Sequence, residues 1–282
     1  TPVFNKKGDM AILTRYAADF TPLTSLPHFI TGTQLAQAVG IRHTLERART
    51  RWPEATGILY YKLNDNNPAI SWSTVDWYGT PKMAYHILRQ AFRPLHACVL
   101  FDQLSSIGEP LSVPVYLLDD ADALSAMAWQ VVVRAFNAKL EQVAQAEFAG
   151  QGTAGRVKKL GALDLSPDQT QSIPLFIVSE VRSGRSTLRT FYWINYTGIQ
   201  GCLFQLPETR LALTAGPDRL TVRNTGEKPA VAVHFVSEAG PDTFHCDDSF
   251  FWMEPGECRD IAVNQTGDVH AVAWNAEPTA AG

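Results

Sequence analysis

Residues 56–95 read TGILYYKLNDNNPAISWSTVDWYGTPKMAYHILRQAFRPL, and this stretch decides how the N-terminal third of the chain is organised. Gly57 to Leu63 has the length and apolar continuity of a buried strand. A polar and aromatic loop follows, and Thr80 and Pro81 have the residue types of an N-cap and a first helical position. Strand, loop and helix in this order form one unit of an α/β layer.

Two helices are predicted before this stretch. Apolar residues recur at helical spacing from Met10 to Phe20, and a Pro-containing loop ends that element. The pair Thr31 and Gln34 matches a capping box, which predicts that a second helix starts there and ends before Pro53. Its apolar residues fall on one face: Leu35, Ala38, Ile41, Leu45, Ala48 and Trp52.

From Ala97 onward the pattern changes to short β-branched or alternating runs that turn residues separate. Two immunoglobulin-like β-sandwiches are therefore predicted, in residues 96–200 and 201–282. The expected strands are Val113–Leu118, Trp129–Phe136, Leu175–Val178, Leu188–Ile194, Leu211–Thr214, Leu220–Arg223, Ala230–Val236, Phe250–Met253, Arg259–Val263 and Val269–Trp274. The alanine-rich segment 124–147 is interpreted as strand rather than helix because three valines, 131–133, lie within it.

Composition places the chain among folded globular proteins. Of its 282 residues, 45% are hydrophobic and 18% are charged, which excludes collagen-like, coiled-coil and disordered classes. No apolar run reaches the about 18 residues of a membrane span, and no segment resembles a signal peptide, so the compartment stays undetermined. Because the numbering begins at Thr1 rather than Met, we expect the true N-terminus to be missing.

Charge and cysteine content limit the partners that we expect. Residues 1–95 carry a net charge of +5 and residues 96–282 a net charge of −9. No nucleic-acid-binding motif accompanies the basic part, so neither nucleic acid nor membrane is an expected partner. The four cysteines lack CxxC spacing and are expected to be free thiols, although a bridge between Cys246 and Cys258 is an alternative. No metal site and no cofactor are predicted, and the oligomeric state is left open.

The candidate binding residues follow the predicted strand. Tyr61, Asn64 and Asp65 lie at or just beyond its end, where the loops of a βα-barrel form the active-site face. Polar and aromatic side chains there favour a sugar-like ligand. The structural alternative is that Asn64 and Asp65 close the strand while Trp72 and Trp77 pack beneath the next helix. His43, His86 and His96 have no acidic partner at a recognisable spacing and are interpreted as isolated.

Residues 56–95 resemble the last strand and last helix of the catalytic barrel in glycoside hydrolase family two, in particular its β-mannosidase branch. The similarity covers the aromatic pair, the Asn-Asp that follows, the Ser-Trp-Ser motif and a Lys-bearing helix that ends Phe-x-Pro. Asn224–Gly226, 247–251 and 254–257 are similar to the terminal immunoglobulin-like domain of that family. The family usually has Trp where Tyr61 stands and Gln where Lys62 stands, which puts the sugar preference in question.

The resemblance implies that residues 1–95 are the C-terminal end of a TIM-type (β/α)8 barrel, followed by the two sandwiches in a mainly β chain. It implies a retaining, exo-acting parent enzyme that removes terminal β-linked sugars. Retaining glycosidases need two carboxyl groups about 5 Å apart, and in this family both lie upstream of the matched region. We therefore expect no catalytic residue here and no activity of the chain alone. Tyr61 is expected to stack on the sugar, and Asn64 and Asp65 to hydrogen-bond its hydroxyls.

The competing hypothesis is a stand-alone sandwich protein that binds carbohydrate or other proteins without catalysis. Such a module would present aromatic side chains along one exposed face. The tryptophans in the sandwich region, Trp129, Trp193, Trp252 and Trp274, fall within strand patterns and are predicted to be core residues.

Overall fold

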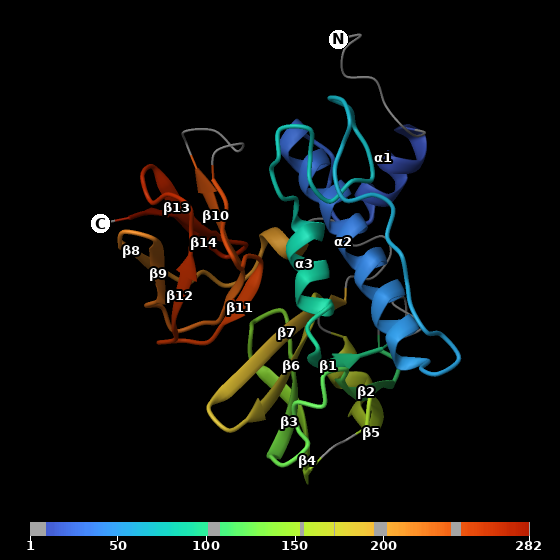
Figure 1. Ribbon diagram of the computed structural model, residues 1–282. Coiled ribbons are helices and arrows are strands. Elements are labelled where there is room, and N and C mark those ends of the chain that lie inside the picture. Colours follow the sequence, from blue (N-terminus) through green and yellow to red (C-terminus); the bar gives the residue numbers. More distant parts are fainter. Residues whose placement is uncertain are drawn as a thin grey trace. The chain divides into compact units, whose positions relative to one another are not determined.

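The computed structural model describes residues 10–100, 108–152, 155–171, 173–194, 202–237 and 244–281 (Figure 1). The chain divides into two compact units. The first comprises Thr1–Ala38, Tyr60–Ile87 and Leu203–Gly282, and the second comprises Val39–Leu59 and Leu88–Cys202. None of the helices in the described part is both long and apolar enough to span a bilayer.

Three helices precede the strands: α1 (Met10–Ala18), α2 (Leu26–Thr50) and α3 (Met83–Ala91). All three were predicted, but two begin elsewhere than expected. Helix α3 begins at Met83, so Thr80 and Pro81 are not its N-cap and first residue.

Helix α2 begins five residues before the expected capping box, so Thr31 lies inside the helix. Ser25 supplies the earlier start, because its Oγ accepts a hydrogen bond from the backbone N–H of His28 at 3.3 Å, as an N-cap does. Pro27 is tolerated because the first turn of a helix needs no N–H donor there.

The buried strand predicted for Gly57 to Leu63 is wrong. None of these residues belongs to a strand of the described chain, and the side chains of Leu59, Tyr61 and Leu63 are 100%, 77% and 62% exposed. A parallel strand is stable only between neighbouring strands and under helices that cover the sheet, and the described residues provide neither. Pairing begins at the end of the segment, where the Leu63 carbonyl accepts hydrogen bonds from the N–H groups of Thr74 and Val75.

The second unit contains a β-sandwich of two antiparallel sheets. One sheet has the strand order β1-β2-β5 and the other β4-β3-β6-β7. Their facing side chains form one apolar core, which includes Val115, Val131 and Ile177. A short helix, α4 (Pro167–Thr170), precedes β6. The strands are β1 (Leu95–Val99), β2 (Leu111–Asp119), β3 (Ala128–Phe136), β4 (Gln142–Gln151), β5 (Val157–Leu165), β6 (Leu175–Ser183) and β7 (Ser186–Ile194).

The first unit contains a second sandwich, also antiparallel throughout its named strands. Its sheets have the orders β12-β9-β8 and β11-β10-β13-β14, and Leu220, Val233 and Met253 contribute to the core between them. A 3-10 turn, η1 (Cys202–Phe204), precedes it. The strands are β8 (Leu211–Ala215), β9 (Arg219–Asn224), β10 (Ala230–Ser237), β11 (Phe251–Met253), β12 (Cys258–Ala262), β13 (Val269–Ala273) and β14 (Ala276–Ala280).

Every strand expected in the two sandwiches is present, and the interpretation of residues 124–147 as strand is confirmed by β3 and β4. Three further strands, β1, β5 and β14, were not predicted, and β4 was expected only as part of segment 124–147, not as a separate strand. Cys98, Cys246 and Cys258 are free thiols, so the alternative of a Cys246–Cys258 bridge is wrong.

Candidate functional site

Asp65 is the centre of a polar cluster in the loop between the extended segment and α3. Its side chain is 1% exposed, and both carboxylate oxygens accept short hydrogen bonds. Ser71 Oγ donates to Oδ1 at 2.6 Å and Ser73 Oγ donates to Oδ2 at 2.5 Å. Because the two serines flank Trp72, the carboxylate fixes the backbone on either side of that tryptophan.

Two lysines surround the same carboxylate. Lys62 Nζ lies 2.8 Å from Asp65 Oδ1, and Lys82 Nζ lies 4.0 Å from Oδ2 and donates to Ser73 Oγ at 3.0 Å. Burial alone would raise the pKa of Asp65, but the hydrogen bonds from Lys62, Ser71 and Ser73 outweigh it and lower that pKa well below its usual range. Burial lowers the pKa of Lys82, opposed by the charge of Asp65. The Asp65 carboxylate therefore stays ionised between the two lysines.

Two glutamines of α2 attach the loop to the helix. Gln37 Nε2 donates to the carbonyl oxygens of Trp72 at 2.7 Å and Ser73 at 3.1 Å. The hydroxyl of Tyr60 donates to the same Trp72 carbonyl. Gln34 Oε1 accepts a hydrogen bond from the N–H of Met83 at 3.0 Å, which satisfies a free donor at the start of α3. The loop is thus held at both ends by side chains one helical turn apart on α2.

The three predicted binding residues adopt different orientations. Tyr61 is exposed, and so is Asn64, whose amide donates to the Asp65 carbonyl at 3.1 Å. The carboxylate of Asp65 is buried and satisfied by its own loop, as the structural alternative for this residue expected. The other part of that alternative is wrong, because Trp72 and Trp77 are 44% and 48% exposed rather than packed beneath a helix.

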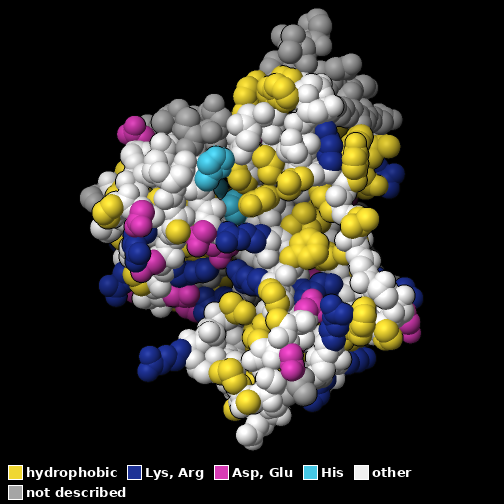
Figure 2. Space-filling model, viewed as in Figure 1, with side chains coloured by type: hydrophobic (Ala, Val, Ile, Leu, Met, Phe, Trp, Pro, Cys, Tyr) yellow, Lys and Arg dark blue, Asp and Glu magenta, His cyan; other side chains and the backbone are white. Residues whose placement is uncertain are grey.

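Exposed aromatic and aliphatic side chains therefore surround a rigid polar core. Trp72, Trp77 and Tyr78 were not singled out as binding residues from the sequence, although their clustering between Ser71 and Gly79 was a visible signal. Figure 2 shows hydrophobic side chains gathered on the surface over α3 and the loops around it. Flat aromatic faces next to amide and hydroxyl groups can stack on and hydrogen-bond a sugar ring.

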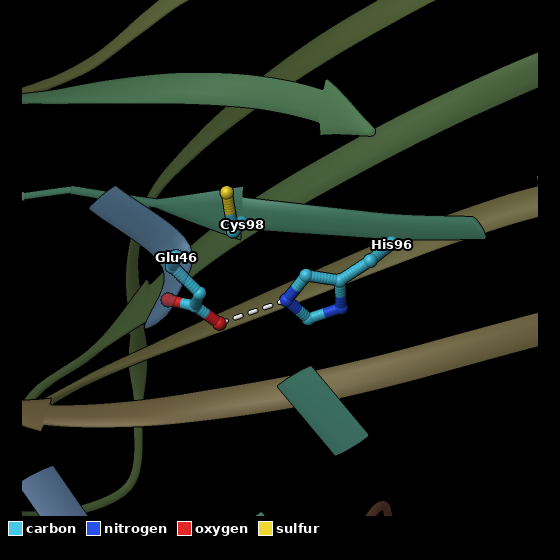
Figure 3. Close-up of side chains that lie close together, drawn as sticks. All are labelled: Glu46, His96 and Cys98. Atoms are coloured by element: carbon cyan, nitrogen blue, oxygen red, sulfur yellow. Dashed lines mark hydrogen bonds and ion pairs between the residues drawn. The ribbon is translucent and has the colours of Figure 1, made fainter. Parts of the chain in front are cut away.

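A second polar cluster lies in the other unit. Glu46 of α2 and His96 of β1 point toward each other, with Cys98 two residues along the strand (Figure 3). His96 Nε2 and Glu46 Oε1 are 2.8 Å apart, and both side chains are almost fully buried. The interpretation of His96 as isolated was wrong, because its partner is 50 residues away in the sequence and no local spacing reveals it.

Glu46, His96 and Cys98 carry ligand types that could hold a metal ion, since their donor atoms lie within 4.8 Å of one another. The surroundings instead fit a hydrogen-bond network. Tyr192 donates its hydroxyl to the same Glu46 Oε1 at 2.9 Å, and the guanidinium of Arg42 lies over the Tyr192 ring. Burial, and then the charge of Glu46, raise the pKa of the Cys98 thiol, which disfavours the thiolate that a metal needs.

Comparison with known proteins gives a consistent set of relatives. The exo-β-D-glucosaminidase of Streptomyces avermitilis is 25% identical over 94% of this chain, and β-mannosidase B of Thermothelomyces thermophilus is 23% identical over 90%. The exo-chitosanase CsxA of Amycolatopsis orientalis has the same fold over 96% of this chain, with a TM-score of 0.76 and 18% identity. No protein-family model matches the chain. This chain is related to the C-terminal portion of glycoside hydrolase family two enzymes.

The relationship to glycoside hydrolase family two covers nearly all of this chain but a limited part of its relatives. The chain spans 32% of the glucosaminidase, 31% of the mannosidase and 37% of the exo-chitosanase. The chain is rich in β-sheet and has few helices. Its relatives by sequence carry the names of glycosidases.

Proposed function

We propose that this chain forms the C-terminal part of a retaining, exo-acting, β-mannosidase-like glycoside hydrolase that removes terminal β-linked sugars. In this proposal residues 1–95 form the end of a (β/α)8 barrel, and residues 96–200 and 201–282 are immunoglobulin-like sandwiches. The parent reaction passes through an oxocarbenium-like transition state and a covalent glycosyl-enzyme intermediate. The chain contributes one wall of the sugar pocket.

The observation that carries the proposal is the exposed segment 57–63. It is seven residues long and apolar, and its alternate residues Leu59, Tyr61 and Leu63 extend into solvent. Alternate side chains on one face are what a strand buries when its neighbours are present. The rigid loop of Asp65 follows at once, in the order in which a barrel strand and its active-site loop follow one another.

The loop supports separate roles for the predicted residues. Tyr61 and Asn64 are exposed and available to a sugar, and Trp72 offers a third surface at the same loop. Both oxygens of Asp65 are engaged by serines, so we assign Asp65 as a positioning residue that fixes the backbone around Trp72. In this proposal Asn64, and not Asp65, forms the hydrogen bonds to the sugar hydroxyls.

The tryptophans of the sandwiches favour the enzyme part over the stand-alone binding module. Trp129, Trp193 and Trp252 are 5%, 4% and 1% exposed, whereas a carbohydrate-binding face needs several accessible aromatic planes. The described aromatic residues that are most exposed lie instead in the barrel-like part, with Tyr61 at 77%.

The test compares the 282-residue chain with the polypeptide extended by its natural upstream sequence. With p-nitrophenyl β-D-mannoside and β-D-glucosaminide, we expect turnover only by the extended protein, because the catalytic carboxyl pair is proposed to lie upstream. In that protein Tyr61→Ala should raise KM about two- to tenfold, since stacking on an aromatic ring contributes about 0.5–1.5 kcal/mol to binding. The matched control Tyr16→Ala, at a half-exposed tyrosine on α1, should leave KM unchanged. Turnover by the 282-residue chain that disappears on mutation of one of its own carboxylates would refute the proposal.

A further inference from the structure

A cavity of about 470 Å³ lies within the first unit. Its walls come from the first half of α2, the start of α3, η1 and the β10 and β13 strands of the sandwich. Small-molecule sites in proteins are typically about 300–1,000 Å³ and mainly apolar with a few polar groups. The cavity has this size and this kind of wall, with Phe204, Phe235, Phe250 and Trp274 among its lining residues.

Among the described residues that line the cavity there is no Asp, Glu, Lys or Arg, so none of these residues offers a counter-charge to an ionic ligand. The imidazole of His234 is also uncharged at neutral pH, because burial lowers its pKa more than the Ala232 carbonyl raises it. His234 Nδ1 lies 2.8 Å from that carbonyl oxygen, which only accepts. The proton is therefore on Nδ1, and Nε2 remains an acceptor.

An aromatic pair is held at the wall by strained backbone. The rings of His234 and Phe250 stack with centroids 4.6 Å apart and planes 8° apart. Phe250 has φ of 58° and Ala232, whose carbonyl orients the imidazole, has φ of 54°. Such backbone is unfavourable for a residue other than glycine, and strain of this kind concentrates at ligand sites. The fold thus uses unfavourable backbone to present a flat, uncharged ring surface.

Two hydroxyl groups at the cavity have no hydrogen-bond partner in the described part of the chain. They are Thr80 Oγ1 and Ser237 Oγ, each shielded from solvent. The backbone of Thr80 is fixed on both sides, because its N–H donates to Asp76 Oδ1 at 2.9 Å and its carbonyl accepts from the Asp76 N–H at 3.0 Å. Shielded polar groups without a partner are rare and call for a ligand or an ordered water.

We propose that this cavity is a binding site for an uncharged aromatic ring that carries a hydroxyl group, which bonds to Thr80. A saccharide is a poorer fit, because it carries a hydroxyl on almost every carbon, whereas aromatic and aliphatic side chains form much of the wall. A phenol-sized ring places its faces against aromatic and aliphatic walls and needs one or two hydrogen bonds, the number that the shielded hydroxyls offer. This site does not depend on the enzymatic proposal.

The test is a ligand titration of the full 282-residue chain, monitored by saturation-transfer NMR of the ligand. Phenol should bind saturably, and toluene, which has no hydroxyl, more weakly. Thr80→Val should weaken phenol binding about three- to tenfold, the effect of one lost neutral hydrogen bond, and leave toluene unchanged. If Thr80→Val fails to fold by circular dichroism, Thr80→Ala, which removes the same hydroxyl, provides the same comparison.

A large side chain introduced at the rim of the cavity tests whether the ligand binds inside it. Val236 is 48% exposed and lines the cavity, so Val236→Trp should abolish binding of both rings without loss of core packing. Val236→Thr keeps the shape of the side chain and should bind as the unmodified chain does. The inference is overturned if phenol does not bind saturably, which would leave ordered water as the partner of the hydroxyls. It is also overturned if Val236→Trp binds phenol normally, or if methyl β-D-mannoside binds more tightly than phenol.

Discussion

At the scale of single residues, Asp65 shows how a buried charge is made tolerable. Removal of a carboxylate from water is costly, but hydrogen bonds from two serines and the ammonium of Lys62 replace the lost hydration. The carboxylate in turn fixes Ser71 and Ser73, and with them the exposed Trp72. Asp65, which is itself buried, can thus determine where the exposed indole of Trp72 lies.

Asp65→Asn should destabilise the first unit by about 1–3 kcal/mol, because the neutral amide leaves the charges of Lys62 and Lys82 without their anion. The pKa of Asp65 is lower in the folded chain than in the unfolded one. Its contribution is therefore complete above the unfolded value of about 4 and is lost only as pH falls toward the folded value. Urea unfolding should show a constant difference between variant and wild type from pH 5 to 8, which shrinks below about pH 4.

The control for this comparison is Asp218→Asn, at a carboxylate that is 79% exposed. It should leave the free energy of unfolding nearly unchanged across the same range. If the difference in the free energy of unfolding between wild type and Asp65→Asn grew as pH decreased, that would contradict the hydrogen bonds that the Asp65 carboxylate accepts.

At the scale of elements, α2 owes its attachment in the second unit to polar as well as apolar contacts. Arg42 and Glu46, four residues apart on one face, are 4% and 1% exposed. Arg42 donates to the Phe191 carbonyl, and Glu46 accepts from Tyr192 of β7 and lies 2.8 Å from His96 of β1. Opposite charges at i and i+4 face the same side of a helix. The spacing of Arg42 and Glu46 was therefore the feature of the sequence that could have indicated polar contacts on this face of α2.

His96 should make the stability of the second unit depend on pH. Burial lowers its pKa in the folded state despite the hydrogen bond to Glu46. The unfolded chain therefore binds the proton at higher pH than the folded chain does, and stability falls as pH decreases through the unfolded value of about 6.5. His96→Gln keeps a hydrogen-bond donor for Glu46 but cannot titrate, so its unfolding free energy should vary less between pH 5 and 8.

The measurement is urea unfolding of wild type and His96→Gln at several pH values, with His245→Gln, at an exposed histidine, as the matched control. Equal pH dependence of wild type and His96→Gln would show that another group is responsible.

Sequence patterns predicted elements well where one residue class dominated. The valine-rich and aromatic strands β3, β6 and β7 were identified because their residues favour strands wherever they occur. Strand β4 was not predicted as a separate strand because Gln, Ala, Glu and Gly dominate it; its pairing with β3 over the whole length of that strand forms it. The segment 57–63 shows the reverse case, in which high apolar content predicts a strand but no partner is present to pair with it.

At the scale of the whole molecule, the two sandwiches have closed cores, while the apolar segment 57–63 stays largely exposed. Val115 and Val233 are completely buried in their sandwiches, whereas Leu59 and Leu63 are mostly in solvent. Sequence patterning predicted both cores but could not show that the barrel-like segment would remain uncovered, because periodicity reports which face is apolar and not what lies against it. Large exposed apolar surfaces mark interfaces.

The exposed apolar segment should cause the isolated chain to self-associate. Leu59 and Leu63 are 100% and 62% exposed, and burial of such side chains against a second molecule is worth about 1.5–3 kcal/mol each. The double variant Leu59→Lys, Leu63→Lys should therefore be more monomeric in sedimentation velocity over a concentration series. Ser186→Lys, Thr187→Lys adds the same charge at exposed positions of a sandwich and should associate as wild type does. The series should be run at about 0.5 M salt, because the net charge of +5 on residues 1–95 opposes association until it is screened. If the wild-type chain stays monomeric up to the highest concentration, segment 57–63 is stable in solvent without a second molecule packed against it. That result would remove the main support for its interpretation as a barrel strand.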